Sequence, residues 1–190
     1  MSWSIFEVLA PIYGPISRML FSDTWSEIIS QIDLSNEDTV LDVGGGQGIL
    51  LESLQKEKPG IDVVLLDSSL QMVRRSKTNK VLGNASKNPF SDGSFDHILC
   101  LDALHHFENK KESLREMIRV LKHDGDIIIL ELDTKSPLTK FIEFVEKLLG
   151  EPSYFFEPEV LERFFSNNGF ETTIHTLNSY EYILQAKKSD

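Results

Sequence analysis

The sequence predicts a doubly wound α/β fold, in which helices cover both faces of a mostly parallel sheet. Through the middle of the chain, short apolar runs rich in β-branched residues alternate with segments of helical apolar spacing. Short continuous apolar runs are typical of strands that are buried on both faces of a parallel sheet. Regular alternation of strand and helix indicates right-handed crossover connections. The 190 residues suffice for a single domain with a full hydrophobic core.

Four strands and two helices are expected in the central part. The expected strands are residues 40–43, 63–66, 98–101 and 127–130. A leucine stripe over residues 50–54 predicts a helix that ends at Pro59-Gly60. Apolar residues at i, i+3, i+4 and i+7 over 114–121 predict a second helix, with residues 123–125 as its exit.

Residues 1–35 are expected to form an N-terminal helical lid. Residues 24–27 have the pattern of a capping box, and two prolines and a glycine interrupt the segment before it. We expect residues 1–22 to close over the site when a cofactor binds, with a permanently docked helix as the alternative.

The C-terminal third changes character. We expect a helical cap over residues 134–169, with one helix beginning at Ser136-Pro137 and another running from Pro158 to Gly169. Residues 170–190 are expected to form an antiparallel hairpin, with Asn178-Ser179 at its turn. The predicted organisation is thus one domain over residues 1–190, with residues 36–133 as its cofactor-binding core.

Composition excludes several classes of protein. The chain has 19 basic and 30 acidic residues, a formal net charge of −11, which disfavours a nucleic-acid partner. One cysteine, Cys100, excludes an internal disulfide and a cysteine-based zinc site, and the histidine spacing predicts no metal site. The absence of a leader pattern and of a long apolar run predicts a cytoplasmic protein without stable membrane insertion. Monomer and homodimer both stay open.

A glycine-rich bend carries the strongest chemical motif. Asp42 lies in the first strand, and glycines follow at alternate positions up to Gly48. Glycines at a strand-to-helix bend let a ligand approach the backbone closely, and the first such bend of an open parallel sheet is a ligand site. The dinucleotide pattern G-x-G-x-x-G does not fit, because Ile49 and Leu51 occupy its last position. Asp67 ends the next strand, where a carboxylate can accept both hydroxyls of a ribose.

These features resemble the class I S-adenosylmethionine-dependent methyltransferases, of the methyltransferase domain 11 type. The motifs that carry the resemblance are Asp42 to Gly48, Asp67-Ser68, Gly83-Asn84-Ala85, Asn88-Pro89-Phe90, Ser94-Phe95-Asp96, Leu101 to Phe107 and Arg119 to Asp126. They cover residues 36–133 in order. The resemblance implies a Rossmann-like, mostly parallel seven-stranded sheet that ends in an antiparallel hairpin. The start of the chain, from Phe6 through Leu9-Ala10-Pro11 to Tyr13, is similar to the ubiquinone/menaquinone C-methyltransferase branch.

The resemblance implies S-adenosylmethionine as cofactor and S-adenosylhomocysteine as its product. The residues it implies around the cofactor are Asp42, Gly44, Gly45, Gly46, Asp67, Ser68, Met72, Asn84, Ala85 and Leu101. In these roles Asp67 holds the ribose, Ser68 and Met72 flank the adenine, and Asn84 lies at its edge. Asn84 stands where the family usually has an acid. The alternative for Met72 is a core position on its helix.

The acceptor end is less determined by the sequence. His105 and His106, just beyond the fourth strand, and Tyr13 in the lid are the candidate catalytic residues, with Asp102 as a rival. Aromatic residues in the lid and cap favour a small, largely apolar organic acceptor. Helical spacing favours the core for Phe141 and Phe144, whereas Tyr154-Phe155-Phe156 cannot all face one core.

We therefore expect an S-adenosylmethionine-dependent methyltransferase that acts on a small-molecule acceptor. Two alternatives stay open at this point. One is an oxidoreductase with an NAD-type nucleotide cofactor, and the other is a non-enzymatic S-adenosylmethionine-binding or scaffold protein.

Overall fold

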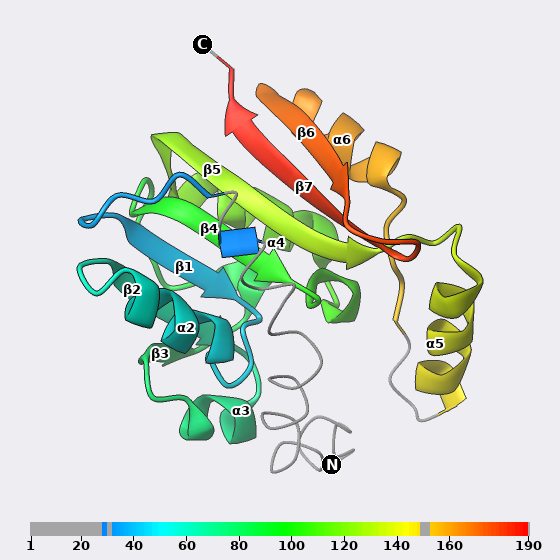
Figure 1. The fold of residues 1–190 in the computed structure, drawn as a ribbon, viewed down its shortest axis with the longest axis horizontal. Helices are drawn as coiled ribbons and strands as arrows, with labels where there is room; N and C mark the ends of the chain where they lie inside the picture. Colours follow the sequence, from blue (N-terminus) through cyan, green and yellow to red (C-terminus); the bar gives the residue numbers. More distant parts are fainter. Residues whose placement is uncertain (1–27, 30–31, 149–152, 190) are drawn as a thin grey trace.

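A computed structural model describes residues 28–29, 32–148 and 153–189. Seven strands form one mixed sheet in the order β3-β2-β1-β4-β5-β7-β6 (Figure 1). The strands are β1 (Thr39–Val43), β2 (Asp62–Asp67), β3 (Asn79–Leu82), β4 (Phe95–Leu101), β5 (Leu121–Leu132), β6 (Phe170–Thr176) and β7 (Glu181–Lys188). Strands β1 to β5 pair in parallel, and β7 runs antiparallel between β5 and β6. The predicted fold class is confirmed, including the C-terminal hairpin.

The strand order reverses between β1 and β4. From β1 the chain builds outward through β2 and β3, and it then returns to add β4 and β5 on the other side. In an open α/β sheet, ligands bind outside the carboxyl ends of the strands at such a reversal point. The topology therefore places a candidate site beyond the ends of β1, β2 and β4.

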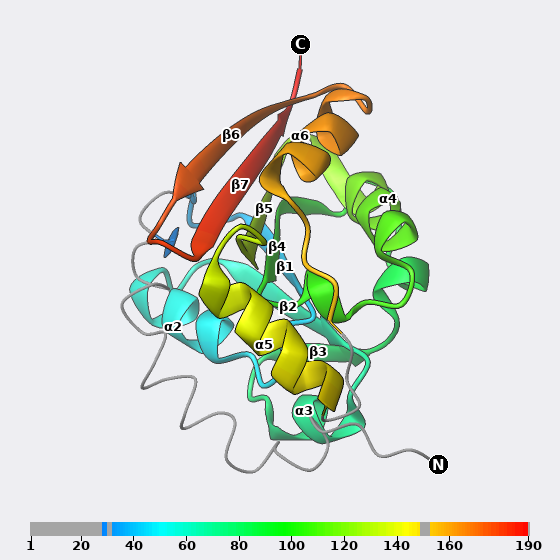
Figure 2. The same ribbon diagram turned by 90° about the vertical axis from the view of Figure 1, so that its right-hand side faces the viewer.

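Helices cover both faces of the sheet. The helices are α2 (Ile49–Glu57), α3 (Leu70–Arg75), α4 (Lys110–Val120), α5 (Pro137–Leu148) and α6 (Pro158–Ser166), with short 3-10 turns η1 (Ala85–Lys87) and η2 (Leu104–His106). Buried side chains of α4 and α6 belong to one core cluster, and those of α2 belong to the other. Figure 2 shows α2 and α4 on opposite sides of the sheet, with α5 across the carboxyl ends of the strands.

The start of β5 differs from the prediction. Residues 123–125, expected as a helix exit, lie within the range of β5. Phe95 of β4 pairs with Leu121, but His97 pairs with Asp126, so the register shifts between the two strands. The residues between the two pairs on β5 bulge out of the ladder, and this irregular pairing explains why the sequence pattern looked like a loop.

Helix α5 begins as predicted but does not bury its aromatic side chains among the described residues. The Ser136 hydroxyl accepts a hydrogen bond from the Leu138 N–H, which caps the first turn. Phe141 is 62% exposed and Phe144 is 64% exposed, so the expectation that both belong to the core is wrong. Helical spacing predicted an apolar face correctly, but it does not specify which element covers that face.

The predicted lid, including Tyr13, lies almost wholly outside the described residues, so its closure over a site stays a prediction. Ile28, Ile29 and Ile32, at the end of that segment, are buried beside α2. In the part of the chain that the structure describes, no helix is long and apolar enough to cross a membrane.

A buried histidine, His97, links β4 to β5 and makes the stability of the fold depend on pH. His97 Nδ1 lies 2.5 Å from Asp126 Oδ1, and Nε2 lies 3.1 Å from Asp38 Oδ2. Burial lowers the pKa of His97, but the hydrogen bonds and charges of Asp126 and Asp38 raise it more, so the net pKa is above its usual value. His97 therefore stabilises the fold fully below its unfolded pKa, and this contribution is lost as the pH rises through the folded pKa.

We expect His97→Gln to lower the free energy of unfolding by about 1 kcal/mol at pH 6, with a smaller loss above pH 8. Urea unfolding across this pH range measures the difference between the variant and the wild type. His175→Gln, at an exposed position of β6, is the control. It should leave the free energy of unfolding unchanged both at pH 6 and above pH 8. A loss for His97→Gln that is independent of pH would show that His97 contributes through packing alone.

Candidate functional site

The glycine-rich bend joins β1 to α2 at the reversal point of the sheet. Gly44, Gly46 and Gly48 all have positive φ angles, of 79°, 59° and 73°. Side chains with a Cβ rarely adopt this conformation, so alternating glycines allow the tight path of the bend. The Gly44 N–H donates to the Leu66 carbonyl at 2.7 Å, which fixes the bend against the end of β2.

Gly44 also meets a packing requirement of the protein itself. A Cβ on Gly44 would lie 2.7 Å from the Cβ of Ala103, in the loop that follows β4. The bend and this loop therefore approach as closely as a glycine allows. The two chain segments that flank the reversal point therefore lie directly against each other.

Asp67, at the end of β2, binds the glycine-rich bend directly. Its Oδ2 accepts a hydrogen bond from the Gly46 N–H at 2.9 Å, and its Oδ1 accepts one from the Ser69 N–H at 2.7 Å. A carboxylate offers about four acceptor positions, so both oxygens retain capacity for a ligand hydroxyl. Burial raises the pKa of Asp67, and the two backbone hydrogen bonds partly oppose that shift.

A second carboxyl group lies beneath the same bend. Asp42 is 2% exposed, and its Oδ2 occupies the space that a Cβ on Gly45 would need. Burial, and then the negative charge of Asp67, raise the pKa of Asp42 to about 7. Two carboxyl groups around one bend favour a cationic ligand and disfavour an anionic one.

The other residues predicted around the cofactor lie at the ends of neighbouring strands. Ser68 is exposed directly after β2, and Leu101 is half-buried at the end of β4. Asn84 follows β3, and its Oδ1 accepts from the Ser86 N–H and hydroxyl, with Ala85 beginning η1. These positions surround the carboxyl ends of β2, β3 and β4. The contact that each residue makes with the cofactor stays a prediction.

Met72 is 3% exposed on α3. Its sulfur lies 3.7 Å from Gln47 Nε2 of the glycine-rich bend. Met72 is thus a core residue that also touches the bend. A core position on its helix and a place beside the cofactor, the two expectations from the sequence, are therefore compatible.

His105 lies in η2, beyond the end of β4, and it is 2% exposed. Its backbone N–H and its ring both bind Glu131 of β5, with Nδ1 3.0 Å from Oε2. Its Nε2 lies 4.0 Å from Asp102 Oδ1. Burial lowers the pKa of His105, but the charge and hydrogen bond of Glu131 raise it above its usual value.

Glu131 was not singled out from the sequence. It is fully buried, and it is the one acidic residue in the apolar run of residues 127–132. A lone carboxylate in a central strand needs a partner, because an unpaired buried charge is costly. The single acidic residue in this apolar run was therefore the signal in the sequence that could have indicated a buried partner such as a histidine.

His106 occupies a different environment from its neighbour. Its Nδ1 lies 3.2 Å from the Ser153 hydroxyl, and its ring lies 4.0 Å from the ring of His105, centroid to centroid. Burial, and then the charge of His105, lower the pKa of His106 to about 3, so its ring is neutral at physiological pH. The pKa values of the two adjacent histidines are therefore shifted in opposite directions.

Asp102, the rival candidate, adopts a positive φ of 52° at the end of β4. Burial raises the pKa of this carboxyl group to about 7, with His105 opposing the shift and Glu131 adding to it. A strained backbone of this kind is found where a side chain is held in a special position.

The three consecutive aromatic residues after α5 point to different surroundings, as their sequence predicted. The Phe155 ring lies 4.2 Å from the His105 ring, whereas Tyr154 is 67% exposed. Phe156 packs against the main core cluster, and its carbonyl accepts a hydrogen bond from the Tyr182 hydroxyl. The aromatic segment therefore joins the histidine end of the site to the core.

Comparison with known proteins agrees with this geometry. A family model described as "Methyltransferase domain" matches residues 41–129. Demethylmenaquinone methyltransferase of Thermotoga maritima is 32% identical over 137 residues, which is 67% of this chain and 60% of that protein. The chain thus matches about three fifths of the length of this curated relative.

Two solved structures share the fold. A structure of a methyltransferase with the Haloferax volcanii Trm112 methyltransferase activator has a TM-score of 0.87 at 16% identity, and both chains are fully covered. Human N-acetylserotonin methyltransferase in complex with S-adenosylmethionine has a TM-score of 0.78 at 20% identity, over 97% of this chain and 57% of that one.

The family match spans the glycine-rich bend, Asp67 and the loop after β4. The acidic surroundings of the bend and the failed dinucleotide pattern agree with this match. Residues 41–129 form a methyltransferase domain of the class I S-adenosylmethionine-dependent type, the family whose cofactor is S-adenosylmethionine.

Proposed function

We propose that this chain transfers the methyl group of S-adenosylmethionine to a small, largely apolar organic acceptor. When bound, S-adenosylmethionine supplies a methyl group on a positively charged sulfonium, which is a built-in leaving group. The task of the protein is then to bind, orient and desolvate the two reactants. The glycine-rich bend and Asp67 serve the cofactor, and the histidine end of the site serves the acceptor.

The hydrogen bond from the Gly46 N–H to Asp67 is the observation that carries this proposal. In dinucleotide-binding proteins, backbone N–H groups of the corresponding bend bind an anionic pyrophosphate. Here one such N–H already binds a carboxylate, and Asp42 adds a second acidic group beneath the bend. The Gly46 N–H is therefore already occupied where a pyrophosphate would need it, and acidic groups beside the bend favour a cationic cofactor.

The acceptor end combines apolar and polar groups. Phe155 and the exposed Tyr154 offer aromatic surface next to His105, which Glu131 holds in place. Such surroundings suit an aromatic acceptor that carries oxygen atoms. The similar protein of Thermotoga maritima is named for demethylmenaquinone, so quinone-type acceptors are the first to test.

A labelled-methyl assay tests the proposed function. The full chain is incubated with S-adenosylmethionine that carries an isotopic methyl group, together with a panel of reduced quinones, phenols and arylamines. We expect label in at least one aromatic acceptor. Tight cofactor binding without transfer across the panel would favour the non-enzymatic alternative. Binding of NADH in place of S-adenosylmethionine would favour the oxidoreductase.

A variant at the end of β3 tests the expected adenine edge. Asn84 caps η1 through Oδ1, a role that a carboxylate can also fill. Asn84→Asp adds a charged acceptor for the adenine amino group, so we expect affinity for S-adenosylhomocysteine to rise by about threefold to tenfold. Lys87→Gln, on the same 3-10 turn, controls for a general change of charge. Calorimetry measures both affinities, and an unchanged value for Asn84→Asp would remove Asn84 from the adenine edge.

A further inference from the structure

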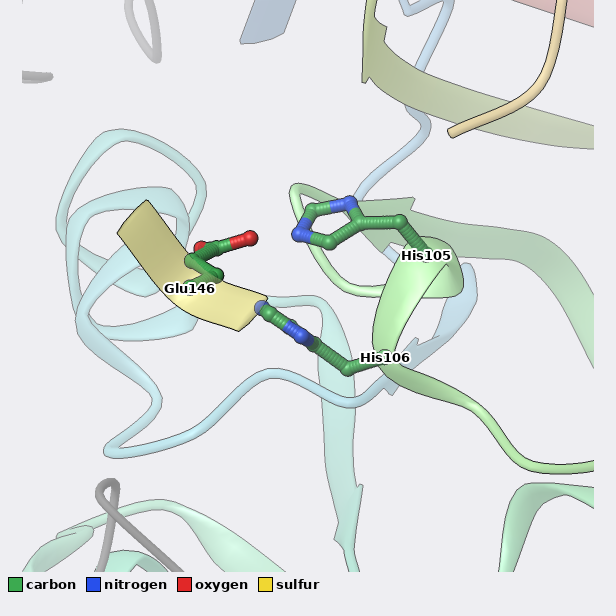
Figure 3. A group of neighbouring side chains, drawn as sticks. All are labelled: His105, His106 and Glu146. Carbon is green, nitrogen blue, oxygen red and sulfur yellow. The ribbon is translucent and has the colours of Figure 1, made fainter. Parts of the chain in front are cut away.

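Three potential metal ligands converge at the acceptor end of the site. The imidazole rings of His105 and His106 in η2 point toward the carboxylate of Glu146 in α5 (Figure 3). One ligand atom from each residue lies within 4.8 Å of the other two. The sequence predicted no metal site, because its histidines lack a metal-binding spacing such as H-E-x-x-H. Glu146 lies too far along the chain to form part of such a motif.

The two histidine rings are oriented by hydrogen bonds at Nδ1. Glu131 binds Nδ1 of His105, and the Ser153 hydroxyl lies 3.2 Å from Nδ1 of His106. A metal-binding histidine commonly donates one ring N–H to a carboxylate or another polar group, which fixes the tautomer and directs the opposite nitrogen to the metal. The contact between Glu131 and His105 is an arrangement of this kind.

Glu146 provides an independent observation. Its Oε2 atom is buried, and it has no hydrogen-bond partner in the part of the chain that the structure describes. A buried carboxylate oxygen without a partner is costly, since it has lost its hydration without a replacement. A cation between Glu146 and the two histidines would supply the missing partner.

We propose that His105, His106 and Glu146 bind a divalent transition-metal ion of the zinc class. Two imidazole nitrogens and one carboxylate oxygen form a ligand set that is typical of zinc sites with an open fourth position. The nearby carboxyl groups of Glu131 and Asp102 add negative charge around His105 and favour a dication.

The present separation is slightly wider than a bound ion requires. Ligand atoms at about 2.0–2.2 Å from a tetrahedral zinc ion lie about 3.3–3.5 Å apart. Since the three ligand atoms lie within 4.8 Å of one another, side-chain movements of about 1 Å would bring them to these separations.

The open fourth position gives the site a chemical use. A bound dication lowers the pKa of a coordinated hydroxyl group, so an acceptor oxygen bound there would lose its proton more readily before methyl transfer. This use rests on the proposed function, whereas metal binding itself does not.

Metal titration of the full chain tests the proposal. After treatment with a chelator and its removal, the protein is titrated with ZnCl₂ by calorimetry and with CoCl₂ by visible absorption. We expect one ion per chain, with d–d absorption bands typical of tetrahedral cobalt. His106→Gln and Glu146→Gln should each weaken binding at least about tenfold. His123→Gln, at an exposed histidine, and Glu143→Gln, one turn earlier on α5, are matched controls that should bind as the wild type does.

Two outcomes would overturn the proposal. One is that the wild type binds neither ion in a one-to-one ratio. The other is that the two ligand variants bind the metal as tightly as their controls do. Circular dichroism confirms that each variant is folded before the comparison. Titration of the same metal-free samples with S-adenosylhomocysteine separates the two proposals, because failure of the metal site leaves cofactor binding intact.

Discussion

Replacing Asp67 with asparagine is expected to weaken S-adenosylmethionine binding by about tenfold to a hundredfold. The carboxylate is expected to hold the ribose hydroxyls through charge-assisted hydrogen bonds, each worth about 1.5–3 kcal/mol. The amide also places an NH₂ group where Oδ1 or Oδ2 now accepts from the Ser69 or Gly46 N–H. Calorimetric titration with S-adenosylhomocysteine measures the affinity without turnover.

Asp62→Asn is the matched control for this variant. Asp62 is an exposed aspartate at the start of the same strand, β2, far from its carboxyl end. The substitution removes the same charge and should leave the affinity unchanged. Equal affinities for Asp67→Asn and the wild type would show that Asp67 only supports the glycine-rich bend and does not touch the cofactor.

Gly44→Ala is expected to lower the free energy of unfolding by about 2–5 kcal/mol. About 1–2 kcal/mol comes from placing an alanine in the left-handed region, where Gly44 has a φ of 79°. A further cost of about 1–3 kcal/mol comes from forcing the new methyl group against Ala103 in a packed interior. Urea unfolding of the two proteins measures the difference.

Gly93→Ala separates these two contributions. Gly93 has a similar positive φ of 62°, but a Cβ there would meet nothing within 4 Å. The free energy of unfolding lost by Gly93→Ala should therefore equal the cost of the left-handed backbone alone, about 1–2 kcal/mol. If both alanine variants lose the same stability, the bend and the loop after β4 are not held in close contact.

The position of the glycine-rich bend and of the two acids beside it could be predicted because its determinants are local. A buried strand, alternating glycines and an acid at the end of the next strand lie within residues 39–67. In a parallel sheet the carboxyl ends of neighbouring strands meet at one edge, so strand assignment alone places Asp42 and Asp67 together. The structure adds the hydrogen bond between Asp67 and the bend, which no sequence pattern specifies.

The arrangement around His105 could not be predicted in the same way. The pairing of His105 with Glu131, and the approach of Glu146, depend on how β5 and α5 sit relative to η2. Contacts between residues far apart in the chain have no periodicity to reveal them. The exposure of Phe141 on α5 has the same cause, because an apolar helix face does not specify its partner.

Competitive titration of the full chain with S-adenosylmethionine and NADH tests most directly whether the acidic glycine-rich bend is built for a cationic cofactor. We expect S-adenosylmethionine to bind one-to-one with a dissociation constant of roughly 1 μM to 1 mM, the range in which the KM values of enzymes usually lie. We expect NADH to cause no heat change and no displacement at the same concentrations. Saturable NADH binding that displaces S-adenosylmethionine would show that the bend accepts a pyrophosphate, contrary to the role of Asp42 and Asp67.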